Sequence, residues 1–350
     1  MKPRARDLGI EIGRLPPGPA NAITDVPGIR VGHATLVEGE SIRTGVTIVL
    51  PPTEPSFAGA HRINGNGELT GLEWIRDSGM LTTPIGLTNT HSVGVVRDAL
   101  VAAARPGEND WSLPVVGETW DGFLNDINGF HVRQEHVFAA LEAAHDGPVE
   151  EGSVGGGTGM ICHGFKGGIG TASRVVEDGW MVGVLVQANH GRRRRLRVDG
   201  APVGERIGPE VVPLPGSDAG EGAGSIIVLV ATDAPLLPGQ CERVARRAGF
   251  GIGRTGGMGE RSSGDFALCL ATGNADLDRS EPELALRMLN DTRVDALYEA
   301  VIDAVEESIL NAMLASDTMT GRHGHTVHAL PQDQLLQALG QAGSSVTSST

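Results

Sequence analysis

The dipeptide Gly224-Ser225 joins a hydroxyl residue to a flexible residue before it and an apolar run after it. A serine hydroxyl that attacks the preceding carbonyl needs a small neighbour and a bendable peptide, which Ala223-Gly224 supplies. The attack converts the amide to an ester, and hydrolysis frees an α-amine with an unperturbed pKa of roughly 7.7–8.0. Near neutral pH this amine can act as the base for its own hydroxyl, so no catalytic histidine is required. A plain turn at Gly-Ser is the alternative that the dipeptide alone leaves open.

Other patterns that could do chemistry fit their expected surroundings less well. Gly251, Gly253 and Gly256 spell G-x-G-x-x-G, but a helix is expected before them, where a dinucleotide site needs a strand. The H-x-H-x-x-H cluster at 323–328 has no carboxylate or cysteine nearby to complete a metal site, so surface histidines are expected. The three cysteines are too far apart in the sequence for a typical metal-binding motif, and an odd number cannot all pair in disulfides. They are Cys162, Cys241 and Cys269.

Glycines are concentrated in the segment 155–163, which reads GGGTGMICH. Ordering so many glycines costs much conformational entropy, so the backbone must approach something closely there. A second chain segment and a ligand are both compatible with that requirement. Residues 166–171, KGGIGT, are also rich in glycine and resemble a second strand.

The elements that must position these residues are strands alternating loosely with helices. Runs rich in β-branched residues predict strands at 46–50, 85–88, 181–187, 226–231 and 266–271. Apolar residues spaced by three and four predict a helix over 294–309. Further helices are expected at 68–77, 93–104, 135–144 and 240–248, the last capped by Gly249. The proline-containing stretch 197–224 is predicted to be an exposed loop, and its composition alone also fits an interdomain linker.

Composition and charge narrow the classes of function. The chain has 350 residues, of which 51 are glycine, and a formal net charge of -15. A net negative charge does not attract the phosphate backbone of nucleic acids, so nucleic acid is not an expected partner. The four arginines at 192–195 are the local exception, and we expect a solvated loop or a subunit-contact patch there. No signal peptide or membrane span is evident, which with the cysteine usage predicts a cytoplasmic protein that does not bind membranes.

Several long strings resemble the L-aminopeptidase D-amidase/D-esterase family, which includes the β-peptidyl aminopeptidases. They are GSIIV through ATDAP (224–235), GGGTGMICHGFKGGIGTAS (155–173), VLVQANHG (184–191), DVPGIRVGH (25–33) and MTGR (319–322). The resemblance therefore spans nearly the whole chain.

This resemblance implies a four-layer α-β-β-α sandwich, similar to N-terminal-nucleophile hydrolases but differently connected. It further implies a single catalytic domain that cuts itself into residues 1–224 and 225–350, which stay together. A homo-oligomer, often a tetramer, without metal or organic cofactor is the expected assembly.

At the positions that match the family's motifs, the resemblance implies that Ser225 is the nucleophile. It also implies that the side-chain amide of Asn189 donates a hydrogen bond to the oxyanion. Ser263 and Asp265, in SSGD, match the serine and acidic residue that orient the nucleophile and its amine. They could share one strand face, although a turn is the alternative for Ser263-Gly264-Asp265.

Glu118, in ETWDG, matches the position whose carboxylate holds the free ammonium group of the substrate. Trp120 departs from the tyrosine that relatives can carry at its position. An indole donates a hydrogen bond but accepts none, so the second oxyanion donor and the acyl-side preference depend on this residue.

The predicted function is hydrolysis of short peptides, amides or esters with a free N-terminal amine, through an acyl-enzyme on Ser225. An acyltransferase of the ornithine acetyltransferase type is the alternative enzyme. The non-enzymatic alternative is an unprocessed binding or scaffold protein, in which Gly224-Ser225 is only a loop.

Overall fold

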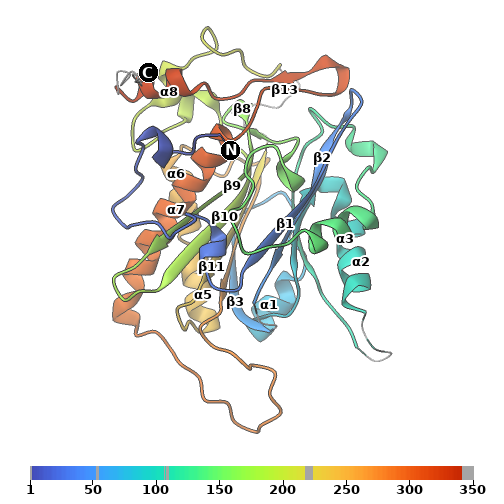
Figure 1. Cartoon of the computed structure of the whole chain (residues 1–350), viewed down its shortest axis with the longest axis vertical. Coiled ribbons are helices and arrows are strands. Elements are labelled where there is room, and N and C mark those ends of the chain that lie inside the picture. The colour runs from blue at the N-terminus through green and yellow to red at the C-terminus, as the bar shows by residue number, and fades with distance from the viewer. Residues whose placement is uncertain (1, 53–54, 106, 108–109, 217–223, 341–350) are drawn as a thin grey trace, which may run out of the picture.

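Two β-sheets pack face to face, and helices cover both outer faces of the pair (Figure 1). The structure is a computed structural model that describes residues 2–52, 55–105, 107, 110–216 and 224–340. The four layers run helix, sheet, sheet, helix, as the resemblance implied.

The larger sheet has six strands in the order β4-β3-β12-β11-β10-β9. Only β11 and β12 run parallel, and every other neighbouring pair is antiparallel. In chain order the strands are β3 (Ser56–Gly65), β4 (Met80–Leu81), β9 (Gly168–Val175), β10 (Met181–Asn189), β11 (Ser225–Thr232) and β12 (Gly264–Ala271).

The smaller sheet has four strands in the order β1-β2-β5-β6, with β5 and β6 parallel. These strands are β1 (Arg30–Glu38), β2 (Ile42–Leu50), β5 (Ile85–Asn89) and β6 (Val115–Thr119). Two short hairpins complete the strands, β7 (Ile161–Cys162) with β8 (Phe165–Lys166), and β13 (Met319–Thr320) with β14 (Thr326–Val327).

Helices α2 (Val93–Ala104) and α3 (Gln134–Glu142) cover the four-stranded sheet. The six-stranded sheet is covered by α5 (Pro238–Ala245), α6 (Ala248–Arg254) and α7 (Val294–Leu314). The other α-helices within the described residues are α1 (Leu72–Ser78), α4 (Val203–Arg206) and α8 (Gln332–Ala338).

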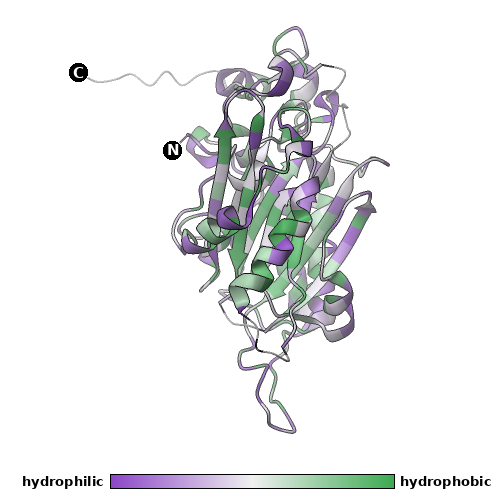
Figure 2. Ribbon diagram, turned by 90° about the vertical axis from the view of Figure 1, so that its right-hand side faces the viewer, coloured by the Kyte–Doolittle hydropathy of each residue, from purple (hydrophilic) through white to green (hydrophobic). Residues whose placement is uncertain are grey.

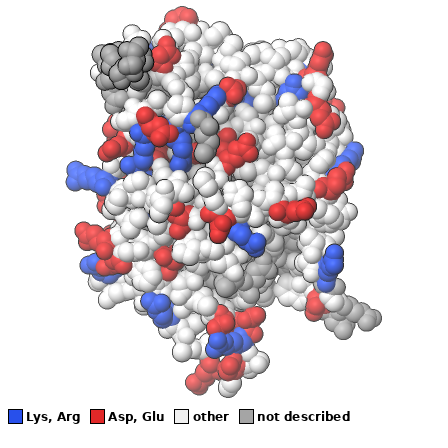
Figure 3. All heavy atoms as spheres, viewed as in Figure 1, with Lys and Arg blue, Asp and Glu red and all other residues white. Residues whose placement is uncertain are grey.

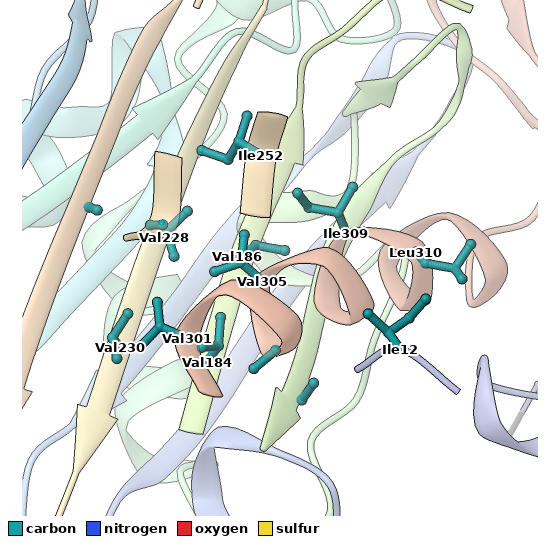
Figure 4. Packing of buried hydrophobic residues seen from close by; sticks show 14 of the residues in the cluster. Ile12, Val184, Val186, Val228, Val230, Ile252, Val301, Val305, Ile309 and Leu310 are labelled. Atoms are coloured by element: carbon teal, nitrogen blue, oxygen red, sulfur yellow. The ribbon is translucent and has the colours of Figure 1, made fainter. Parts of the chain in front are cut away.

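Apolar residues fill both faces of the six-stranded sheet, so its central strands read as continuous rather than alternating hydrophobic runs (Figure 2). Toward the helices, Val301 and Val305 of α7 pack on Val184 and Val186 of β10, with Val228 beside them (Figure 4). A second hydrophobic cluster lies between the two sheets. The six-stranded sheet contributes Leu185, Leu229 and Leu268 to it, and the four-stranded sheet contributes Val49 and Leu87.

The strands expected from β-branched runs are confirmed in β2, β5, β10, β11 and β12, and the apolar stripe is confirmed in α7. The expected helix 240–248 with Gly249 as its cap is wrong. Helix α5 ends at Ala245, and α6 begins at Ala248 and contains Gly249. A C-terminal cap needs a left-handed backbone, and Gly249 is absent from the residues with positive φ.

The arginine run does not form a fully solvated patch, because Arg193 is only 2% exposed. Its guanidinium lies 3.4 Å above the Phe165 ring and donates to backbone carbonyls, including those of His163 and Gly164. Neighbouring Arg195 pairs with Glu260 at 2.9 Å. The run thus fixes loops near the end of β10, and only Arg194 is exposed as expected.

The glycine-rich segment approaches a second chain segment, as one of its two interpretations required. Gly155–Gly157 form a 3₁₀ turn against both sheets. A Cβ on Gly156 would lie 2.2 Å from Oε1 of Gln187 and 2.5 Å from the carbonyl oxygen of Leu87. Glycine is therefore required there by packing.

The surface carries acidic and basic side chains intermixed, and no continuous basic patch is seen on the face drawn in Figure 3. Within the described parts of the chain, no helix is both long enough and apolar enough to cross a membrane.

Close packing of β9 on α7 yields a stability prediction for Gly170, because an added Cβ would lie 1.9 Å from the carbonyl oxygen of Ser308. Gly170→Ala is expected to push α7 away and to lower the free energy of unfolding by about 1–3 kcal/mol. The control is Gly94→Ala in α2, where nothing lies within 4 Å of the added methyl. Urea unfolding should show no loss for the control. Equal stability of the two variants would contradict the predicted packing.

Candidate active site

The ends of three adjacent strands meet where β11 begins. Ser225 is the register partner of Asn189 in the antiparallel pair β10–β11. On the other side Ile226 is the register partner of Asp265 in the parallel pair β11–β12. Strand pairing alone therefore brings Ser225, Asn189 and Asp265 to one edge of the sheet.

Ser225 is 5% exposed and is the first residue of β11. The backbone N–H of Gly264 donates to its Oγ at 2.9 Å. This bond occupies a lone pair of the hydroxyl oxygen and fixes its position. The hydroxyl proton stays available for transfer to a base.

Asp265 accepts two hydrogen bonds beside the start of β11. Its Oδ2 accepts from the Ser263 hydroxyl at 2.7 Å, and its Oδ1 accepts from the Ile226 N–H at 3.1 Å. Burial raises the pKa of Asp265 to about 6, although both hydrogen bonds favour the ionised form and limit the rise. The turn alternative for Ser263-Gly264-Asp265 is wrong, because Gly264 and Asp265 lie within β12. A turn ends just before the strand, where the Ser263 N–H donates to the Glu260 carbonyl oxygen at 2.8 Å.

The side chain of Asn189 is held at both ends. Its Oδ1 accepts from the Ile161 N–H at 2.7 Å, and its Nδ2 donates to the Trp120 carbonyl oxygen at 2.9 Å. An amide nitrogen carries two hydrogens, so one N–H remains for another acceptor. Nδ2 also lies 3.2 Å from the place where a Cβ on Gly224 would stand.

Gly224 is confined by the strand beside it. A Cβ at this position would lie 1.9 Å from the carbonyl oxygen of Asn189, so no other residue fits without displacing the junction. The peptide preceding Ser225 is thus pressed against the residue whose amide has a free donor.

Glu118 lies near the end of β6 and is only 3% exposed. It faces the same region from the four-stranded sheet. Its Oε1 accepts from the Glu68 N–H at 3.0 Å, and its Oε2 accepts from the Thr90 hydroxyl. Burial raises the pKa of Glu118, and these hydrogen bonds oppose the rise. No lysine or arginine within the described ranges pairs with this carboxylate, so it offers an acceptor for a cation from outside.

Gly67 links Glu118 to the β12 edge. A Cβ on Gly67 would lie 2.8 Å from Oε1 of Glu118 and 2.9 Å from the Cα of Gly264. Since Gly264 in turn donates to Ser225, the carboxylate and the hydroxyl are separated by only two glycine backbones. Gly67 and Glu68 also line a cleft of about 520 Å³, whose apolar walls include Trp74, Leu113 and Phe266.

Trp120 contributes its backbone to this region, since its carbonyl oxygen orients Asn189. The side chain is 37% exposed, and its indole folds over Gly122, where a Cβ would lie 2.7 Å from Nε1. The indole therefore packs against the backbone of Gly122 and stays partly exposed.

The sequence did not indicate Gly67, Thr90 or Glu260 as part of the site. Gly67 lies in the turn-forming string NGNG, the only local signal available. The Glu260 carbonyl oxygen lies 2.8 Å from the Ser263 hydroxyl and is a second acceptor for the one proton that also points to Asp265. The Glu260 side chain pairs with Arg195. Their roles depend on contacts between distant segments, which spacing along the chain does not reveal.

Two of the patterns weighed in the sequence lie elsewhere. Gly251 and Gly253 are inside α6, and Gly251 packs on α7, where an added Cβ would lie 2.6 Å from the Val305 Cβ. His325 stacks on Phe123 with ring centroids 4.3 Å apart, and its Nδ1 lies 3.0 Å from the Phe123 carbonyl oxygen.

Comparison with known families and proteins identifies close similarities over almost the whole chain. Residues 21–327 match the family described as peptidase family S58. The chain is 46% identical to the β-peptidyl aminopeptidase BapA of Sphingosinicella microcystinivorans, over 95% of this chain and 91% of that protein.

Solved structures give the same result. A β-aminopeptidase from a Burkholderia species superposes with a TM-score of 0.91 at 54% identity, over 97% of this chain and 99% of that one. The L-aminopeptidase D-Ala-esterase/amidase of Ochrobactrum anthropi, described as a new variant of the Ntn hydrolase fold, superposes with a TM-score of 0.89 at 44% identity. It covers 98% of this chain and 100% of that one.

Proposed function

Because the chain belongs to peptidase family S58 and is a serine aminopeptidase and amidase, we propose that it cuts its own Gly224–Ser225 bond to create the catalytic nucleophile. The observation that carries the proposal is the packing of Gly224 against Asn189, with the Ser225 hydroxyl fixed at the adjacent strand end. A single catalytic domain would then consist of residues 1–224 and 225–350 held together by β10–β11 pairing. Residues 217–223, part of the stretch that the sequence predicts to be an exposed loop, lie outside the described part of the chain.

The cleavage proceeds in two balanced steps. The Ser225 Oγ attacks the Gly224 carbonyl carbon, its proton passes to the departing amide nitrogen, and the amide becomes an ester. Water then hydrolyses the ester, which leaves a carboxylate on Gly224 and an α-amine on Ser225. The free N–H of Asn189 would stabilise the oxyanion, a contact worth about 2.7–4 kcal/mol where such donors have been removed.

In the mature enzyme the same groups act on substrate. The neutral α-amine of Ser225 takes the hydroxyl proton as the oxygen attacks the substrate carbonyl, and returns it to the leaving amine. Asp265 lies one residue from this amine in the strand register and attracts its protonated form. Ser263 keeps the Asp265 carboxylate in place through its hydroxyl.

The buried carboxylate of Glu118 binds the free ammonium group of the substrate. Two neutral donors hold it, which leaves room for a cationic partner. A fixed distance between Glu118 and Ser225 would then select the residue at the N-terminus of a peptide. Short peptides, amides and esters, including peptides with an N-terminal β-amino acid, are the proposed substrates, and the second group accords with the names of the relatives.

The two alternatives drawn from the sequence are less well supported. The relatives are aminopeptidases, which disfavours an acyltransferase of the ornithine acetyltransferase type. An unprocessed binding or scaffold protein would have no use for a donor and a carboxylate aimed at one serine. Product release in water without an amine acceptor separates hydrolysis from transfer.

Assembly and location complete the proposal. Leu284, Leu286 and Met288 are exposed on a segment that extends away from the sandwich between β12 and α7 (Figure 1). Exposed apolar side chains grouped in this way are typical of an interaction surface, which supports a homo-oligomer, with a tetramer as the proposed size. The three buried free cysteines are compatible with the reducing cytoplasm.

Replacing the nucleophile tests the proposal directly. Ser225→Ala is expected to remain one polypeptide and to lose aminopeptidase turnover by a factor on the order of 10⁴ or more. Ser225→Cys keeps a nucleophilic atom of similar placement and is the matched control, expected to retain slow self-cleavage. Denaturing gels and p-nitroanilide hydrolysis measure both properties. Cleavage or wild-type turnover in Ser225→Ala would refute the assignment.

Removing the charge of Glu118 should weaken binding of the free amine. For Glu118→Gln, the ratio kcat/KM for an aminoacyl p-nitroanilide is expected to fall roughly 10- to 100-fold, mainly through KM, because one charged hydrogen bond is lost. Glu68→Gln is the control, since it keeps the backbone N–H that donates to Glu118, and loss of the Glu68 charge favours the ionised form of Glu118. An unchanged KM in Glu118→Gln would contradict the proposed role.

The raised pKa of Asp265 predicts a pH dependence of self-cleavage. Above its pKa of about 6 the carboxylate accepts both hydrogen bonds, and below it one oxygen carries a proton and an acceptor is lost. The cleavage rate of freshly refolded chain should therefore decline as pH falls through about 6. Asp265→Asn should cleave slowly, with no inflection in that range. A wild-type inflection that survives in this variant would assign the titration to another group.

A further inference from the structure

A group of soft ligand atoms lies behind the proposed oxyanion donor and takes no part in the chemistry above. The thiol of Cys162 and one ring nitrogen each of His163 and His190 lie within 4.8 Å of one another. Cys162 and His163 are 0% exposed, and His190 is 5% exposed. The spacing of the cysteines predicted no metal site, because His190 joins the group only through the fold.

The backbone holds these residues together tightly. The β7–β8 turn places His163 and Gly164 in the left-handed region, with φ of 50° and 72°. The His163 N–H donates to the His190 carbonyl oxygen at 2.7 Å, which ties the turn to the end of β10. A Cβ on Gly191 would lie 2.3 Å from the His163 ring, so only glycine leaves room for this imidazole.

Both imidazoles have an unused nitrogen in this buried setting. Nδ1 of His163 lies 3.2 Å from the Arg192 carbonyl oxygen, so this nitrogen carries the proton and donates. Its Nε2 has no partner. His190 instead turns its Nδ1 toward the Cys162 thiol, and its own Nε2, also without a partner, lies on the side of Gly257. A buried polar atom without a partner costs about 1–3 kcal/mol, and a metal ion bound to Nε2 of His163 would remove that cost for this residue. The backbone hydrogen bond on the opposite ring nitrogen of His163 is the orienting contact usual for metal-bound histidine.

The ligand set and its surroundings define the class of ion. One sulfur and two imidazoles suit Zn²⁺ or Cu⁺, whereas Mg²⁺ and Ca²⁺ require oxygen ligands. Sγ of Cys162 lies 3.9 Å from Nδ1 of His190, close to the separation of two ligands on one such ion. The nearby cations are Lys166, which donates to Gly167 O at 2.8 Å, and Arg193, which donates to His163 O at 3.1 Å. Both donate to backbone carbonyls, so neither occupies the ligand atoms.

We propose that Cys162, His163 and His190 form a buried site for one thiophilic metal ion, Zn²⁺ or Cu⁺. On binding, the Cys162 thiol releases its proton to solvent and the thiolate binds the ion together with two neutral imidazoles. His190 directly follows Asn189, and Ile161, which donates to Asn189 Oδ1, directly precedes Cys162. The ion therefore joins the two backbone segments that orient Asn189, and its site is distinct from the atoms that touch substrate.

Metal binding by the full chain tests this site independently of catalysis. Protein treated with a chelator is refolded with Zn²⁺, or anaerobically with Cu⁺, then desalted, and its metal content is measured by mass spectrometry. Wild type is expected to retain one ion per chain, and Cys162→Ala to bind at least about 10-fold more weakly. Cys269→Ala, which removes a buried cysteine outside the group, and the double variant His323→Ala/His325→Ala should both retain the ion.

A second readout keeps the test decisive if Cys162→Ala does not fold. Wild type refolded with Co²⁺ should show the absorbance of a thiolate-to-cobalt charge transfer, and its thermal midpoint should rise by several degrees with Zn²⁺. No retained ion with either metal, or full retention in folded Cys162→Ala, would overturn the proposal. So would a cobalt complex without thiolate absorbance.

Discussion

Strand β11 begins between two neighbours that approach it from opposite directions, and the chemistry depends on this pairing. The antiparallel strand β10 ends at Asn189, while the parallel strand β12 begins beside Asp265. Their registers set a donor and a carboxylate on either side of Ser225. A shift of one residue in either pair would turn these side chains to the opposite face of the sheet.

Glycines allow the rest of the site to approach that strand end. Gly224 fits against the Asn189 carbonyl, and Gly67 fits between Glu118 and Gly264, because neither has a Cβ. The four-stranded sheet can therefore present Glu118 close to the edge of the six-stranded sheet. Such close contacts, together with the turn at Gly155–Gly157, account for part of the high glycine content of the chain.

Local patterns predicted the central strands and α7 because β-branched runs and an apolar stripe act over a few residues. The break between α5 and α6 and the burial of Arg193 were missed, since both depend on what packs against them. The resemblance supplied Asn189, Ser263 and Glu118, which the structure brings to one region. Spacing could not reveal Gly67 or the Cys162–His190 contact, whose partners come from distant segments.

A backbone break before Ser225 is the central claim, because the proposed base exists only as a chain terminus. Intact-mass measurement of the purified wild-type protein under denaturing conditions, with N-terminal sequencing, tests it most directly. The account predicts two polypeptides, 1–224 and 225–350, and the second begins Ser-Ile-Ile. A fully active preparation that consists of one uncut chain of 350 residues would contradict it.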